Sequence, residues 1–159
     1  MPDQTQKLND LMPTIKAQLQ SGGSVRFSPN GTSMLPMLRQ GVDTVVLSPL
    51  PQRLQPYDLP LYQRDNGQYV LHRIVAVNDG VYTCIGDNQF DLEYGVRHDQ
   101  MIGLVTEFYR REKLCSTKSY VHRIYCRIWH RTRGIRRIWR LGKSVFIIVL
   151  KKVFGKNGR

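Results

Sequence analysis

The sequence is poor in cysteine and has no long hydrophobic run. Its three cysteines, Cys84, Cys115 and Cys126, are scattered and form no CxxC pair, which argues against a disulfide framework and a zinc site. No stretch approaches the ~20 apolar residues that a membrane-spanning helix needs. The N-terminus lacks the basic start, apolar core and small-residue cleavage site of a secretory signal. We therefore expect no signal peptide, spanning helix, metal or cofactor, and a cytoplasmic or peripherally membrane-associated protein.

Acidic residues are absent from the C-terminal part of the chain. Residues 1–112 contain all 12 Asp and Glu and 10 of the 24 Lys and Arg, so residues 113–159 carry the whole positive excess behind the net charge of +12. A length of 159 residues suits one domain with an accessory segment. We expect an amphipathic helix over residues 1–23, a β-rich domain over 24–112 and a basic helical tail over 113–159.

Short apolar runs separated by turn residues predict the fold class. Helical spacing of apolar residues ends at Gly22 and Gly23, and the tripeptide Asp65-Asn66-Gly67 is a strong hairpin signal between two predicted strands. Residues 86–100 are predicted to form a turn and a polar loop. We expect a small, coiled, mainly antiparallel β fold, with strands over residues 25–29, 44–47, 59–63, 69–77, 81–85 and 101–109.

Ser33 occupies a sharp turn in the segment Gly31-Thr32-Ser33-Met34-Leu35-Pro36. Glycine lets a backbone approach a ligand closely, and proline restrains the residue before it. A serine hydroxyl becomes a nucleophile only beside a base and near donors for the oxyanion. The turn therefore predicts a candidate nucleophile that still needs a base.

Lysine is missing between Lys16 and Lys113, so the β-rich part offers histidines as bases instead. His72 lies on the predicted strand 69–77 and shares a face with Val70 and Ile74, where apolar surroundings favour the neutral imidazole. His98 lies in a predicted loop that would hold it less rigidly. His72 is therefore the favoured base.

Each of these residues also has an ordinary structural interpretation. A serine between glycine and proline commonly caps or closes a turn, and a strand histidine is commonly a satisfied core residue. Asp87 in Gly86-Asp87-Asn88 fits a turn because Asp and Asn bond their own backbone. Their order and spacing together favour a catalytic arrangement.

The strings GTSMLPML, YVLHRIVAV, IGDNQFD and MIGLV resemble the signal peptidase I and LexA-like serine peptidase superfamily over roughly residues 24–106. The resemblance implies Ser33 as nucleophile and His72, followed by Arg73, as base, similar to the histidine-type signal peptidases of archaea and the endoplasmic reticulum. Histidine-type members tend to have an aspartate six residues beyond the Gly-Asp aspartate, where this chain has Glu93. Asp87 and the nearby Asp91 are both candidates for orienting His72.

The resemblance implies a serine endopeptidase that cleaves an extended protein or peptide substrate after a small residue. His72 would take the Ser33 proton, and backbone donors around Gly31, Thr32 and Ser33 would hold the oxyanion. The residues expected beside the substrate are Met34, Pro36, Arg73 and Asn88.

Residues 113–159 combine arginines with aromatic and aliphatic residues at helical spacing. Cationic amphipathic helices of this kind lie on anionic bilayers, so we expect an anionic membrane surface as a partner. Compared with that family, we expect no N-terminal membrane-spanning segment in this chain, and this tail in its place. The residues expected to contact the membrane are Trp129, Trp139, Arg136, Arg137, Phe146, Ile147, Lys151 and Lys152.

Other functions stay open. A LexA-like regulator could bind nucleic acid through the tail, although the chain has no helix-turn-helix signal and no lysine base, and the apolar run 145–150 does not suit phosphate binding. A non-catalytic module could hold an extended peptide at a strand edge. A solvated basic arm is the ordinary interpretation of the tail. Cys84 lies in a predicted strand without a separate base, which disfavours a cysteine protease.

Overall fold

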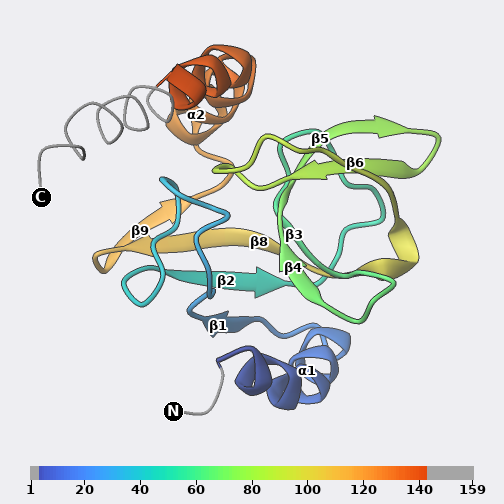
Figure 1. The fold of residues 1–159 in the computed structure, drawn as a ribbon. Helices are drawn as coiled ribbons and strands as arrows, with labels where there is room; N and C mark the ends of the chain where they lie inside the picture. Colours follow the sequence, from blue (N-terminus) through green and yellow to red (C-terminus); the bar gives the residue numbers. More distant parts are fainter. Residues whose placement is uncertain (1–3, 143–159) are drawn as a thin grey trace, which may run out of the picture.

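The computed structural model describes residues 4–142, and two antiparallel sheets dominate it (Figure 1). The larger sheet has the order β1-β2-β8-β3-β4, and β9 also pairs with β8. The smaller sheet has the order β5-β6-β7. The strands are β1 (Val25–Phe27), β2 (Thr44–Ser48), β3 (Pro60–Gln63), β4 (Tyr69–Leu71), β5 (Arg73–Asn78), β6 (Val81–Ile85), β7 (Glu93–Arg97), β8 (Met101–Arg110) and β9 (Lys113–Ser116).

The helices lie at the two ends of the molecule. Helix α1 (Gln4–Gln20) lies below β1 in Figure 1, and α2 (Tyr120–Arg131) lies at the top. A short 3-10 turn, η1 (His98–Gln100), precedes β8. Residues 133–142 are helical again after a one-residue break. Within the described range no helix is both long and apolar enough to cross a membrane.

The expectation of a mainly β, antiparallel fold is confirmed. The Asn-Gly hairpin is present between β3 and β4, where Arg64 and Gln68 close the turn through a backbone hydrogen bond of 2.9 Å. Gly67 has φ +85°, a left-handed conformation that favours glycine. The polar-loop prediction was wrong in part, because β7 forms there and pairs with β6. Its sequence, EYGVR, lacks the apolar alternation of a half-buried strand.

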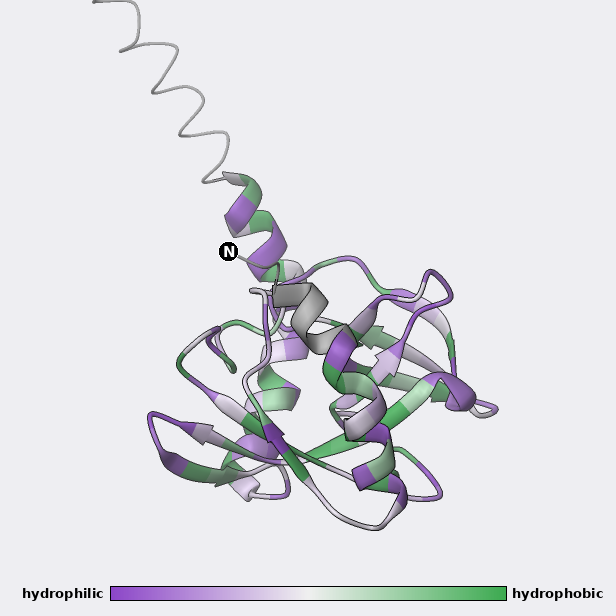
Figure 2. Ribbon diagram, turned by 90° about the horizontal axis from the view of Figure 1, so that it is seen from below, coloured by the Kyte–Doolittle hydropathy of each residue, from purple (hydrophilic) through white to green (hydrophobic). Residues whose placement is uncertain are grey.

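Two cores lie on either side of the β3–β4 hairpin. Leu61 and Leu71 belong to the first core, which includes Met12, Ile15 and Leu19 of α1. Tyr62 and Val70 belong to the second core, beside the smaller sheet. Successive strand residues point to opposite faces, so the hairpin contributes to both cores. In Figure 2 hydrophobic residues fall mainly in the strands and hydrophilic residues in the loops.

The predicted strand 69–77 is interrupted at His72. β4 pairs with β3 in the larger sheet and β5 pairs with β6 in the smaller one, so the chain crosses between the sheets at this residue. The boundary expected at residue 113 falls inside the β8–β9 hairpin, because Lys113–Ser116 pairs with β8. The regular β structure therefore extends to residue 116, and α2 follows.

Candidate active site

The candidate nucleophile lies in an irregular turn between β1 and β2. Gly31 has φ +86°, which explains the glycine by backbone conformation. The Leu38 N–H donates to the Met34 carbonyl at 2.9 Å, and the side chains of Met34 and Leu38 are buried in the first core. The Ser33 side chain is half-buried, and its N–H makes no hydrogen bond to the described residues. The turn thus anchors Ser33 through its apolar neighbours and leaves a backbone donor unused.

The loop after β6 holds this turn from the other side. The Asn88 N–H donates to the Ser33 carbonyl at 2.8 Å, and the Asn88 side-chain amide donates to the Thr32 carbonyl at 3.2 Å. A Cβ on Gly86 would lie 2.7 Å from the Ser33 carbonyl oxygen, closer than real Cβ atoms approach. Glycine at 86 therefore permits the close packing that fixes Ser33.

His72 lies at the crossover between the two sheets and is 3% exposed. Burial lowers its pKa from 6.5 to about 4; Glu93 opposes this shift and Arg64 adds to it. The ring is therefore neutral at pH 7. The expected neutral imidazole fits the buried position of His72.

Tyr62, Glu93 and Arg64 surround one edge of the His72 ring. The Tyr62 hydroxyl donates to Glu93 Oε2 at 2.8 Å, and Arg64 donates to both Glu93 oxygens at 2.8 and 2.6 Å. His72 Nδ1 lies 3.4 Å from the Tyr62 hydroxyl oxygen and 3.6 Å from Glu93 Oε2. Burial by itself raises the pKa of Glu93, but the hydrogen bonds from Arg64 and Tyr62 lower it overall.

These contacts select a tautomer of His72. The single Tyr62 proton is donated to Glu93, so the Tyr62 oxygen is left to accept a proton from His72 Nδ1–H. A neutral ring with its proton on Nδ1 has a free lone pair on Nε2. Nε2 has no hydrogen-bond partner in the described structure, and it is not among the buried unpaired atoms. The basic nitrogen is therefore not completely enclosed, although the His72 side chain as a whole is buried.

Ser33 and His72 line one cleft of about 470 Å³, which we call the Ser33 cleft. Met34, Asn88 and Arg64 line it as well, and none of the described residues that line it is a lysine. No hydrogen bond joins the Ser33 hydroxyl to His72 within residues 4–142. The cleft nevertheless presents a serine and a neutral histidine to the same space, next to the unused N–H of Ser33.

The structure places Glu93, rather than Asp87 or Asp91, beside His72. Asp87 is 1% exposed, and its carboxylate oxygens accept from Arg73 at 2.9 and 3.0 Å. Burial raises the pKa of Asp87, but the charge of Arg73 and the hydrogen bonds from His130 and Arg73 together lower it well below its usual range. Asp91 is exposed and lies beside a neighbouring hollow. The structure thus gives neither aspartate the orienting contact expected for it.

Two expected substrate neighbours do not reach the Ser33 cleft. Arg73 is fully buried; besides Asp87 it donates to the Tyr57 carbonyl at 3.0 Å and to Met37 Sδ at 2.7 Å. Pro36 follows the turn and borders a separate apolar hollow. Met34 and Asn88 do line the cleft, as expected. Arg73 is a buried counter-ion to Asp87 in this fold.

Two expected membrane-contact residues face the protein. The Trp129 indole N–H donates to the Asp87 carbonyl at 2.7 Å, and the Arg136 guanidinium stacks 3.7 Å from the Trp129 ring. Trp139 and Arg137 are exposed. The other four expected contacts, Phe146, Ile147, Lys151 and Lys152, lie outside the described residues.

The residues around Nδ1 were not all found from sequence. Tyr62 and Arg64 lie in the β3–β4 hairpin, and no motif singled them out. Glu93 occupied the position at which histidine-type peptidases tend to have an aspartate, and its sixth place after Asp87 was the available signal. A glutamate side chain is one methylene longer, and here the Tyr62 hydroxyl lies between it and the ring.

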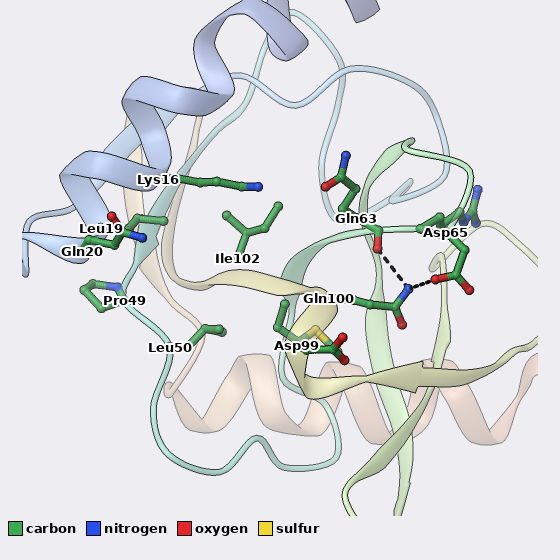
Figure 3. Close-up of a pocket in the computed structure, with 12 residues that line it drawn as sticks. Lys16, Leu19, Gln20, Pro49, Leu50, Gln63, Asp65, Asp99, Gln100 and Ile102 are labelled. Carbon is green, nitrogen blue, oxygen red and sulfur yellow. Dashed lines mark hydrogen bonds between the residues drawn. The ribbon is translucent and has the colours of Figure 1, made fainter.

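A second hollow of about 440 Å³ lies between α1 and the start of β8 (Figure 3). The Gln100 amide donates to the Gln63 carbonyl and to Asp65 Oδ1, both at 3.1 Å. Lys16 borders this hollow and lies 5.8 Å from the centre of the Tyr69 ring. Tyr69 also lines the Ser33 cleft, but Lys16 itself is not among the described residues that line it.

Cys84 is an unsuitable nucleophile in this arrangement. It is fully buried, and burial raises the pKa of its thiol to about 12, whereas a reactive cysteine needs a lowered pKa and access. The structure therefore disfavours Cys84 as a nucleophile. No protein-family model, curated protein or solved structure matches this chain, so the resemblance to the signal peptidase and LexA-like superfamily remains a prediction from its motifs.

Proposed function

We propose that the protein is a serine endopeptidase of the signal-peptidase type, with Ser33 as nucleophile and His72 as general base. The observation that carries the proposal is their shared cleft, in which His72 is neutral and has its Nδ1 edge turned to Tyr62 and Glu93. An isolated serine in a turn needs no such neighbours. A buried histidine with an accessible Nε2 is what proton abstraction from a serine requires.

The mechanism follows from these contacts. His72 Nε2 takes the Ser33 proton as the hydroxyl oxygen attacks the peptide carbonyl, and the Ser33 N–H donates to the oxyanion. The imidazolium that forms is stabilised by the nearby Glu93 carboxylate. His72 then protonates the leaving amine and activates the water that releases the acyl-enzyme. Free enzymes often show long catalytic hydrogen bonds that shorten when substrate binds. The lack of a Ser33–His72 hydrogen bond in the described structure is consistent with this behaviour.

Cleavage of synthetic peptides, followed by mass spectrometry, tests the proposal. Ser33→Ala and His72→Gln should each abolish cleavage, because one removes the nucleophile and the other the base. His98→Gln is the matched control: His98 is exposed, bonds the Tyr82 hydroxyl at 2.9 Å and does not line the cleft. Full activity in Ser33→Ala would contradict the assignment. Peptide binding without cleavage by the wild type would instead indicate a non-catalytic peptide-binding module.

We further propose an anionic membrane surface as a partner of the tail. Exposed apolar residues Val121, Ile128, Ile135 and Ile138 recur on the outer side of α2 and of residues 133–142. Exposed arginines alternate with them, and no acidic residue follows Glu112. An apolar face surrounded by arginine suits the bilayer interface, whereas binding to DNA needs the charges alone. Trp129 and Arg136 lie on the inner side, where both donate to the Asp87 carbonyl and the guanidinium stacks on the indole ring.

Flotation with vesicles containing phosphatidylserine tests this partner. Ile135→Asp should reduce binding, because it places a charge on the outer apolar face. Arg136→Gln, on the inner side, should change vesicle binding much less than Ile135→Asp. Equal binding by wild type and Ile135→Asp, together with tight salt-dependent binding to duplex DNA, would favour the nucleic-acid alternative.

A further inference from the structure

A hollow of about 440 Å³ with mainly apolar walls, which we call the apolar recess, adjoins the Ser33 cleft. Asn88 and Arg140 line both spaces. Leu35 and Pro36, the second and third residues after Ser33, form one wall, and Phe90, Trp129 and Trp139 are the other large apolar residues that line it. A peptide bound at Ser33 would therefore meet an apolar surface directly beside the reacting atoms.

The far wall of the apolar recess is fixed in place. Trp129 donates its indole N–H to the Asp87 carbonyl at 2.7 Å, and its ring stacks on Tyr125 with centroids 5.8 Å apart. Arg136 covers the Trp129 ring at 3.7 Å and donates to the Trp129 carbonyl. Asn88, the residue after Asp87, donates its N–H to the Ser33 carbonyl. The same loop therefore supports both Trp129 in the recess wall and the turn that carries Ser33. A preformed apolar wall binds a side chain without the entropic cost of ordering the wall.

The walls also define which side chain fits. Apolar aromatic walls favour a large aliphatic or aromatic group, whose transfer from water is favourable. Arg136 and Arg140 also line the recess and disfavour a cationic side chain, and the Arg140 guanidinium lies 5.6 Å from the centre of the Phe90 ring. The volume exceeds what a small side chain fills.

We propose that the apolar recess is a specificity subsite for a large aliphatic or aromatic side chain of the peptide substrate. This proposal rests on the proposed peptidase function. Because the recess begins two residues from Ser33 and an extended peptide rises about 3.3 Å per residue, the side chain belongs within about two or three positions of the scissile bond. The small residue expected at the bond itself and the large one nearby occupy different spaces.

A peptide library randomised on both sides of a fixed alanine identifies the preferred position in the wild-type protein. The peptide with leucine at that position and its alanine counterpart are then compared across variants. Trp139→Ala and Phe90→Ala should each lower kcat/KM for the leucine peptide about tenfold, the range that apolar pockets supply for aliphatic groups. The alanine peptide should be cleaved at an unchanged rate, which also shows that the variants fold. Ile138→Ala is the control, because Ile138 is exposed and does not line the recess.

The outcomes separate the two proposals. A library without enrichment for large apolar residues overturns the subsite while leaving the peptidase in place. Equal losses on both peptides in Trp139→Ala and Phe90→Ala also overturn it, because the effect would then be general. Failure of the wild type to cleave any peptide contradicts the peptidase proposal and, with it, the subsite.

Discussion

Replacing Glu93 by glutamine tests how His72 works. Glu93 Oε2 lies 3.6 Å from His72 Nδ1 and is joined to it through the Tyr62 hydroxyl. Glutamine keeps the shape of the side chain but removes its charge. The imidazolium of the proposed mechanism would then lie beside Arg64 without a neighbouring carboxylate.

The geometry sets the size of the effect. Two unit charges at this separation interact by about 4–5 kcal/mol at an effective dielectric constant of ~20. The Glu93 side chain is 24% exposed, and water screens part of that interaction. We expect about 2–3 kcal/mol to remain, which corresponds to a loss of roughly 30- to 150-fold in kcat.

The dependence of kcat/KM on pH tests the Glu93→Gln substitution in a second way. Activity needs neutral His72, whose pKa is about 4, so the wild-type kcat/KM should be level through neutral pH and fall as the pH drops through about 4. Glu93 raises the pKa of His72, so Glu93→Gln should move this fall to still lower pH while lowering the plateau. Peptide cleavage between pH 3.5 and 8 measures both effects.

The controls separate orientation from general damage. Asp91→Asn should leave kcat unchanged, because Asp91 is exposed and borders a neighbouring hollow. Tyr62→Phe should lower kcat by about tenfold, since it removes the oxygen that accepts from Nδ1–H, and it leaves the Arg64–Glu93 ion pair in place. Full activity of Glu93→Gln, or an equal loss in Asp91→Asn, would refute the role given to Glu93.

Two further substitutions probe the support of the nucleophile. Gly86→Ala should lower kcat strongly with a folded protein, because its Cβ would meet the serine carbonyl at 2.7 Å; Gly134→Ala, which meets nothing within 4 Å, should keep activity, and circular dichroism with kinetics checks both. Asp87→Asn should lower the free energy of unfolding in urea by about 3–5 kcal/mol, because it leaves Arg73 buried without its counter-ion. Asp79→Asn on an exposed turn should change that energy little, and equal effects of the two aspartate substitutions would contradict this account.

The local structure of the β-rich part followed from its sequence. Apolar runs and tight turns predicted the strands that build both cores, and the Asn-Gly hairpin formed where Asp65, Asn66 and Gly67 indicated it. Alternation along the hairpin also placed Val70, opposite Tyr62, in the second core. These features depend on turn chemistry and on a two-residue period, which are written in neighbouring residues.

Pairings between strands could not all be predicted from the sequence. β7 and β9 have little apolar alternation and form because β6 and β8 offer them edges to pair with. The crossover at His72 likewise depends on two sheets whose partners come from elsewhere in the chain. A hydrogen-bonding edge is a property of the folded sheet, and no local pattern records it.

The sequence by itself pointed to Ser33 and His72, because a lysine-free segment and a glycine-proline turn leave few candidates. The tertiary structure decided which carboxylate accompanies His72 and which face of the tail is free. Glu93 reaches the ring through Tyr62, whereas Asp87 is held by Arg73 and accepts the indole of Trp129 on its carbonyl. Charge partners are chosen by distance and burial after folding, and side chains far apart in the chain meet only then.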